Sequence, residues 1–153
     1  RWVSKAAVFN LPLIGWNMVL NGYIKLRRTD KESIKAMMQV CEDLLGKNIS
    51  VFLFPEGTRS KDGLLRPFKF GAFVLAKKLS VPILPLVLNN TRDALPKNSL
   101  RIKGKHCMEV KVLDEIPVCV FEHMAVEELA EMVRTRIASH VKEHQSNPLN
   151  PET

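Results

Sequence analysis

The sequence contains few cysteines and no long apolar run. Its three cysteines, Cys41, Cys107 and Cys119, lie far apart among 153 residues and form no Cys-x-x-Cys pair. This pattern excludes a readable disulfide framework or zinc site, so we expect reduced thiols facing the cytosol. The longest apolar run, residues 81–88, has eight residues including its two prolines. A membrane-spanning helix needs about 20.

Acidic residues are scarce in the first two thirds of the chain. Residues 1–105 contain 19 Lys and Arg against 7 Asp and Glu, a balance of +12, whereas residues 106–153 contain 4 against 9, a balance of −5. A basic field of this kind attracts phosphate-bearing ligands or an anionic membrane surface. Nucleic acid is not the expected partner, because the chain has a single tyrosine and its basic residues are not interleaved with aromatics.

The composition is that of a globular protein, with 46% apolar and 25% charged residues. A chain of this length buries roughly two thirds of its unfolded surface, which suffices for a core without disulfides or metals. We expect one domain over residues 1–144 and a flexible tail over residues 145–153.

Hydrophobic periodicity predicts helices alternating with strands. Helices are expected at residues 4–9, 13–20, 29–46, 67–79 and 126–141, and strands at residues 23–27, 49–54, 81–88, 100–103 and 108–112, the last two as a hairpin. Strand, helix, strand, helix, strand at this spacing is typical of an α/β fold with a largely parallel sheet flanked by helices.

The clearest predicted helix covers residues 29–46. Thr29 and Glu32 have the spacing of a capping box, and Gly46 suits a left-handed helix end. Steps of three and four place its apolar residues on one face, which should pack against the core: Ile34, Met37, Met38, Cys41, Leu44 and Leu45.

The segment Phe54-Pro55-Glu56-Gly57-Thr58-Arg59-Ser60 follows a predicted buried strand. Ligands of open α/β sheets collect at the carboxyl ends of strands. Gly57 allows close backbone approach, and the guanidinium of Arg59 offers a planar fork for phosphate oxygens. The residues therefore indicate an anion pocket, with an ordinary surface turn carrying a Glu–Arg pair as the alternative.

This segment resembles the third signature block of the glycerolipid acyltransferases, specifically the 1-acylglycerol-3-phosphate (lysophosphatidate) acyltransferase family. Residues 22–28, Gly-Tyr-Ile-Lys-Leu-Arg-Arg, are similar to the second block, and residues 81–86, Val-Pro-Ile-Leu-Pro-Leu, to the fourth. Ser4-Lys5 ahead of residues 11–15, Leu-Pro-Leu-Ile-Gly, resembles the lysine that the family places before a Pro-x-x-Gly stretch. The four matches follow the family order and cover roughly residues 4–116.

The resemblance implies a glycerol-phosphate acyltransferase-like fold and acyl transfer to a lysophospholipid hydroxyl. Acyl-coenzyme A or an acyl-carrier protein would be the donor substrate, and no cofactor or metal is expected. The chain would be membrane-associated at the cytoplasmic face. By the family pattern Arg28 and Arg59 hold the acceptor phosphate, with Lys5 as a third cation, and residues 81–86 support the site.

The rest of the third block shapes the acceptor site in the same pattern, through Glu56 and Gly57, with Thr58 beside them. Arg27 is the alternative to Arg28, because strand alternation turns only one of the two to a given side.

One family feature is missing. The family's first block is a histidine, four residues and an aspartate, but the fifth residue after each histidine here is Lys111, Glu128, Gln145 or Leu149. His123 and Glu128 have the right spacing, but they lie at the wrong end of the chain. We therefore interpret His123 as a surface histidine. The family dyad would precede Arg1, so we expect an N-terminally incomplete acyltransferase that binds ligand without turnover.

Several alternatives remain open on the sequence alone. The chain could be a non-catalytic lysophospholipid- or phosphate-binding module, or a basic nucleic-acid-binding protein. Two groups of cations could either face solvent or contact anionic lipid headgroups: Lys77 with Lys78, and those in residues 101–105. Residues 6–20 fit either an element lying on lipid or a covering helix.

Overall fold

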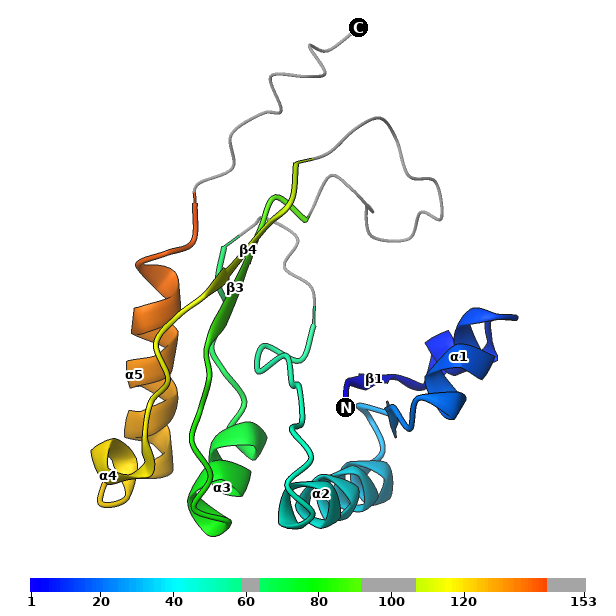
Figure 1. Cartoon of the computed structure of the whole chain (residues 1–153), viewed down its shortest axis with the longest axis horizontal. Coiled ribbons are helices and arrows are strands. Elements are labelled where there is room, and N and C mark those ends of the chain that lie inside the picture. Colours follow the sequence, from blue (N-terminus) through cyan, green and yellow to red (C-terminus); the bar gives the residue numbers. More distant parts are fainter. Residues whose placement is uncertain (59–63, 92–106, 143–153) are drawn as a thin grey trace, which may run out of the picture. The chain divides into compact units, whose positions relative to one another are not determined.

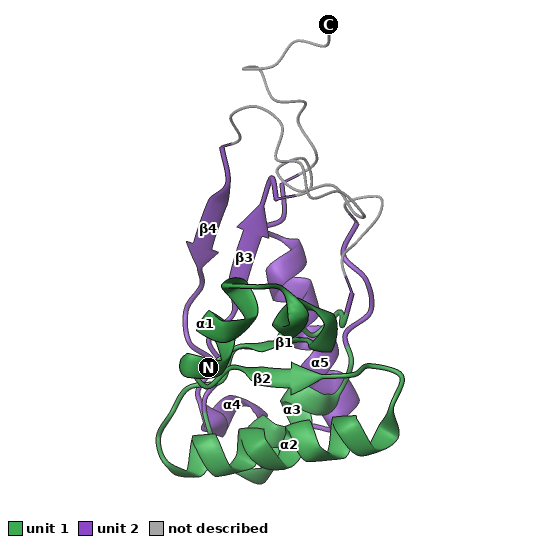
Figure 2. Cartoon of the chain, turned by 90° about the vertical axis from the view of Figure 1, so that its right-hand side faces the viewer, with its two compact units in different colours: residues 1–57, 69–81 green, residues 58–68, 82–153 purple. Residues whose placement is uncertain are grey.

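The computed structural model describes residues 1–58, 64–91 and 107–142 (Figure 1). Three predictions fall outside these residues: the role of Arg59, the strand and cations at 100–105, and the tail at 145–153. The described residues form two compact units (Figure 2). Unit 1 comprises residues 1–57 and 69–81, and unit 2 comprises residues 58–68 and 82–153.

Unit 1 contains three parallel extended segments. Strand β1 (Val3–Lys5) pairs in parallel with β2 (Ile24–Leu26), in the register Val3 to Ile24 and Lys5 to Leu26. Residues 49–54 run parallel to β1 along its other edge, where Val3 N–H donates to Phe52 O at 3.1 Å and Phe52 N–H donates to Arg1 O at 2.7 Å. Strand β1 is therefore central.

Helices complete unit 1: η1 (Ala6–Asn10), α1 (Ile14–Leu20), α2 (Lys31–Gly46) and α3 (Gly71–Lys78). The core joins one face of the strands to α2 and α3 through Val3, Ile24, Met37, Cys41 and Leu75. Because strand side chains alternate, Trp2, Ser4 and Tyr23 point to the opposite face.

Cys41 lies in this core with none of its surface exposed. Burial raises the pKa of its thiol to about 11, with Glu42 adding to the rise and the N-terminal ammonium opposing it. All three cysteines are unpaired, and Cys107 and Cys119 are exposed.

Unit 2 contains an antiparallel pair, β3 (Leu86–Asn89) with β4 (Glu109–Val112), and an antiparallel bridge between Ile83 and Ile116. Helices α4 (Val118–Phe121) and α5 (Val126–Ala138) follow. The chain combines helices with small sheets, which confirms the predicted α/β class. The strands of unit 1 are parallel as expected, whereas those of unit 2 are antiparallel.

Some predicted boundaries were wrong for local reasons. Ser4 and Lys5 belong to β1 rather than to a helix, because β1 bonds to neighbours on both sides. The side chain of Asp30, not Thr29, caps α2, accepting from Glu32 N–H at 3.0 Å and Ser33 N–H at 3.3 Å. Aspartate is at least as good an N-cap as threonine.

Two further helix ends differ from the prediction. Gly46 is the last helical residue of α2 and not its left-handed cap. The residue with a left-handed backbone is Asn48, with φ 57°. Helix α3 starts at Gly71 rather than near Pro67, because Lys69 N–H instead bonds to Pro55 O at 2.8 Å.

Candidate functional site

The carboxyl ends of the three parallel segments of unit 1 meet at one edge. Lys5 ends β1, Arg27 and Arg28 follow β2, and Glu56 follows residues 49–54. The two outer segments flank β1, so their ends lie about 10 Å apart, which is two strand spacings. We call these four residues and Gly57 the basic edge.

Arg28 occupies a fixed turn at the end of β2. Asp30 N–H donates to Arg27 O at 3.2 Å, which closes the turn, and Ser33 Oγ accepts from Arg27 N–H at 2.9 Å. The same Asp30 caps α2, so the turn is tied to the start of that helix. Because β2 ends at Leu26, the alternation of side chains along a strand does not decide between Arg27 and Arg28. Arg27 and Arg28 are both exposed.

Gly57 brings a lysine to the basic edge that the sequence motifs do not indicate. Its φ is +68°, a conformation that favours glycine, and a Cβ built there would lie 2.9 Å from Lys69 Cε. Lys69 is held from the backbone side by its bond to Pro55 O. Lys69 lies nine residues after the end of the third block, so no motif spacing assigns it. Its charge adds to those of Lys5, Arg27 and Arg28.

The structure brings together four of the six predicted site residues, Lys5, Arg28, Glu56 and Gly57. Glu56 is half-buried, whereas Lys5 is exposed like Arg28. Thr58 follows Gly57 in sequence and is exposed. Arg59 lies outside the described residues. With more cations than acids, this edge suits a phosphate group, because charge-assisted contacts to Lys and Arg are strong.

The described histidines lie away from the basic edge in sequence and have other contacts. His123 is exposed, with Nε2 3.5 Å from Glu122 Oε1. His140 Nδ1 lies 3.0 Å from Arg136 O and 3.1 Å from Ser139 Oγ. Within the described residues no group of three or more His, Cys, Asp or Glu side chains could hold a metal ion.

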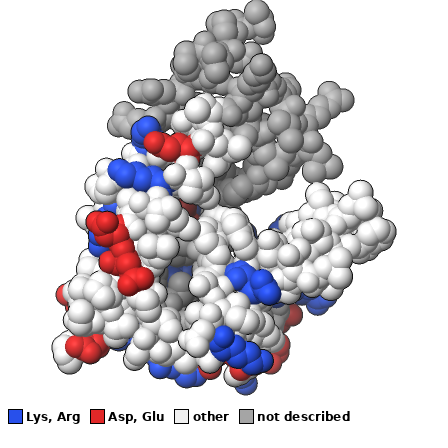
Figure 3. Space-filling model, viewed as in Figure 1, with Lys and Arg blue, Asp and Glu red and all other residues white. Residues whose placement is uncertain are grey.

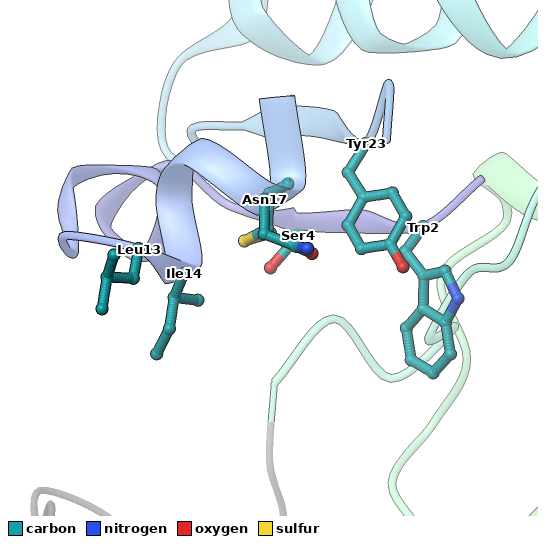
Figure 4. A pocket seen from close by; sticks show the side chains of 7 residues that line it. Trp2, Ser4, Leu13, Ile14, Asn17 and Tyr23 are labelled. Atoms are coloured by element: carbon teal, nitrogen blue, oxygen red, sulfur yellow. The ribbon is translucent and has the colours of Figure 1, made fainter. Parts of the chain in front are cut away.

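A groove of about 480 Å³ lies between α1 and the strands (Figure 4). Its walls are mainly apolar, and the polar side chains among them are Ser4, Asn17 and Tyr23. The other lining residues are Trp2, Leu13, Ile14 and Met18. Trp2 stacks on Phe52 at 4.3 Å between ring centroids. The groove and the basic edge share strand β1, since Ser4 lines the groove and Lys5 follows it.

The fold and site thus define a class: an α/β protein with basic residues at the carboxyl ends of its parallel strands. The family model named Acyltransferase matches residues 1–89, and the chain belongs to this family. The resemblance found in the signature blocks is thereby confirmed.

Individual relatives of the chain are also named as acyltransferases. The chain is 46% identical over 99 residues to the chloroplastic 1-acyl-sn-glycerol-3-phosphate acyltransferase BAT2 of Brassica napus, covering 65% of this chain and 29% of that protein. It is 33% identical over 144 residues to the 1-acyl-sn-glycerol-3-phosphate acyltransferase of Cocos nucifera, covering 94% and 46%. The chain therefore spans less than half the length of these relatives.

A solved structure shares the fold. The crystal structure of the 1-acyl-sn-glycerophosphate acyltransferase PlsC from Thermotoga maritima superimposes with a TM-score of 0.69 at 24% identity, covering 91% of this chain and 54% of that one. Among the described residues of the present chain, no helix is long and apolar enough to cross a membrane.

Proposed function

We propose that the basic edge binds the phosphate of a 1-acylglycerol-3-phosphate acceptor. The chain would be part of an enzyme that transfers a fatty acyl group from a thioester to the free acceptor hydroxyl. The family membership and the names of the relatives support this reaction. The observation that carries the proposal is the convergence of Lys5, Arg28 and Glu56 at the ends of three parallel segments.

The chemistry requires a base, and we propose that this chain does not supply one. In acyl transfer the hydroxyl oxygen attacks the thioester carbonyl carbon, the carbon–sulfur bond breaks, and the hydroxyl proton passes through the base to the leaving thiolate. A positioned base contributes roughly 10²–10⁴ in rate. Since no histidine here is followed by aspartate at the family spacing, we propose that this chain binds acceptor without turnover.

Binding of soluble acceptors tests the site. We expect glycerol 3-phosphate and short-chain lysophosphatidate to bind the chain in calorimetry, and Arg28→Ala to cost about 1.5–3 kcal/mol of binding free energy. Lys5→Ala should weaken binding as well. The matched control is Lys47→Ala, an exposed cation that caps the carboxyl end of α2. Equal losses in Arg28→Ala and Lys47→Ala would contradict the proposal.

Turnover tests the missing base. The 153-residue chain should transfer no acyl group from acyl-coenzyme A or acyl-carrier protein above a Glu56→Ala control. Measurable transfer would overturn the proposed lack of a base. An in-frame His-x4-Asp encoded upstream of Arg1 is expected if the chain is a catalytic domain, whereas a non-catalytic binding module would lack it.

The rival of a basic nucleic-acid-binding protein makes a different prediction. Retention on DNA by general charge would change little in an Arg28→Ala, Arg59→Ala double variant, whereas acceptor binding should be lost.

We further propose a location at the cytoplasmic face of a membrane, where a lysophospholipid acceptor resides.

A further inference from the structure

Helix α1 is apolar on both of its sides. Gly15 and Met18 are buried toward the rest of unit 1, while Trp16, Val19 and Leu20 point outward with 65%, 65% and 86% of their surface exposed. At 100° per residue the outward three share one arc of the helix. Apart from Asn17, which lines the groove, α1 has no polar side chain, and a helix that is apolar all round belongs in a core or in lipid. Its outward side therefore lacks the polar residues expected of a water-facing helix.

The turn that leads into α1 extends this surface. Leu13 has φ 63° and ψ −52°, and Ile14 N–H donates to Pro12 O at 2.7 Å, so residues 12–14 form a classic γ-turn, which is rare and strained. The turn holds Leu13 with 72% of its surface exposed. Strain of this kind persists where the surroundings maintain it, often at functional positions. We call Leu13, Trp16, Val19 and Leu20 the apolar α1 surface.

The position of α1 in its unit is fixed by close backbone contact. A Cβ on Gly15 would lie 2.0 Å from the carbonyl oxygen of Phe9 in η1. Helix α1 thus lies directly against η1 and does not turn its outward side to the core. Figure 3 shows the part of unit 1 that Figure 1 places at α1 as an uncoloured surface with Lys and Arg atoms below it.

The charges of the segment that carries this surface have one sign. Residues 1–29 contain five Lys or Arg and no Asp or Glu, and residues 6–24 contain no charged residue at all. Lys25 Nζ lies 5.8 Å above the Phe9 ring of η1, next to α1. Cations near an anionic membrane contribute about 1 kcal/mol each. A second copy of the chain would instead bring like charges together, which disfavours self-association.

From these observations we propose that the apolar α1 surface contacts an anionic phospholipid bilayer. The seven residues of α1 extend about 10 Å, far less than the ~30 Å of a bilayer core, so the helix lies in the interface rather than across it. Trp16 suits this position, because tryptophan is enriched at membrane interfaces. The inference rests on the proposed function in one respect, since contact with lipid brings the acceptor site to its substrate.

Vesicle flotation tests the contact. The chain should float with vesicles of phosphatidylcholine and 30 mol% phosphatidylglycerol, and more weakly with pure phosphatidylcholine. A Trp16→Ser, Leu20→Ser double variant should bind the anionic vesicles about tenfold more weakly or worse. The matched control is Val110→Ser with Val112→Ser, which removes two exposed apolar side chains from β4 and should change binding less than twofold.

Tryptophan fluorescence gives a second readout that does not depend on the double variant. In a Trp2→Phe background Trp16 should shift its emission to the blue on adding anionic vesicles, and brominated phospholipid should quench it. Unchanged Trp16 emission, or equal losses in the two double variants, would overturn the proposal. So would sedimentation showing a lipid-free dimer that the Trp16→Ser, Leu20→Ser variant dissociates, because a second copy would then cover the surface.

The two proposals fail separately. The Trp16→Ser, Leu20→Ser variant should still bind glycerol 3-phosphate in the absence of vesicles, and Arg28→Ala should still float with vesicles. Loss of glycerol 3-phosphate binding in the apolar variant contradicts the separation of the two surfaces. Absence of glycerol 3-phosphate binding in the parent chain, with vesicle binding retained, rejects the proposed function alone.

Discussion

At the scale of single residues, Gly57 and Lys69 depend on each other. The φ of +68° at Gly57 turns the chain after Pro55, and the space that a side chain would fill is occupied by Lys69 Cε and Cδ, at 2.9 and 3.1 Å from the ideal Cβ position. Glu56 directly precedes this turn. The conformation of Gly57 therefore affects the positions of both Glu56 and Lys69 at the basic edge.

Substitution of these two residues should therefore affect acceptor binding. We expect Gly57→Ala to cost roughly 1–2 kcal/mol of stability, because an L-residue is strained at this φ, and to displace Lys69. Lys69→Ala should leave stability nearly unchanged and weaken glycerol 3-phosphate binding in calorimetry. Lys35→Ala, an exposed cation on α2, is the control. A Lys69→Ala affinity equal to that of the control would show that Lys69 does not contact the ligand.

At the scale of elements, α1 and η1 pack at a distance that only glycine permits. A Cβ at Gly15 meets backbone atoms of Phe9, which cannot move aside as a side chain could. We expect Gly15→Ala to lower the free energy of unfolding by about 1–3 kcal/mol, measured in urea.

Gly46→Ala is the opposite case. Gly46 is helical and nothing lies within 4 Å of its Cβ position, so alanine should leave stability unchanged or raise it by up to about 1 kcal/mol. If both variants changed stability equally, the close contact of α1 with η1 would not exist in solution.

In unit 2 a polar cluster ties the end of α5 to the β3–β4 pair. Asn89, which is buried, donates to Glu109 Oε2 at 3.2 Å and His140 O at 3.3 Å, and its Oδ1 accepts from Lys142 N–H at 3.2 Å. Lys142 Nζ lies 2.9 Å from Glu109 Oε2. The hydrogen bond from Lys142, followed by that from Asn89, lowers the pKa of Glu109 below its ordinary value.

This cluster gives a pH-dependent prediction. Because the folded pKa of Glu109 is lowered, its contribution to stability is present above the unfolded pKa and is lost as the pH falls through the folded value. Lys142→Ala should raise the Glu109 pKa toward its ordinary value in a carbon-13 NMR titration. Lys111→Ala should raise it less, since Lys111 acts only through charge. A larger effect of Lys111→Ala would refute the assigned cause.

The elements that were predictable have a strong local signal. Helix α2 repeats apolar residues from Ile34 to Leu45 at helical steps, and β2 alternates around Lys25. Helix α4 has only four residues, too few to show a period, and it was not predicted. The antiparallel pairing of β3 with β4 depends on contacts between residues 20 or more apart, which an apolar run does not specify.

The candidate site shows the same division. The position of Lys5, Arg28 and Glu56 at one edge was predictable, because the carboxyl ends of parallel strands lie there, whereas their role in binding stays a prediction. The position of Lys69 beside Gly57 was not predictable, because it accompanies a hydrogen bond from Lys69 N–H to Pro55 O that no motif spacing indicates. The exposed side of α1 was left open by the sequence, since an apolar segment fits a core as well as a membrane surface.

At the scale of the whole chain, the basic first two thirds and the acidic last third are separate charge populations. Of the four cations among the described residues 107–142, three form ion pairs: Arg134 lies 2.6 Å from Glu131, Arg136 3.4 Å from Asp114, and Lys142 2.9 Å from Glu109. Arginines of the two populations should therefore respond differently to an anionic ligand.

Nitrogen-15 NMR of the arginine side chains, during a titration with glycerol 3-phosphate, tests the central claim most directly. Single Arg→Lys variants assign the Nε–H resonances. We predict that the Arg28 resonance shifts and saturates as glycerol 3-phosphate is added, while those of Arg134 and Arg136 stay in place. An unshifted Arg28 resonance, or equal shifts at all arginines, would contradict a phosphate site at the basic edge.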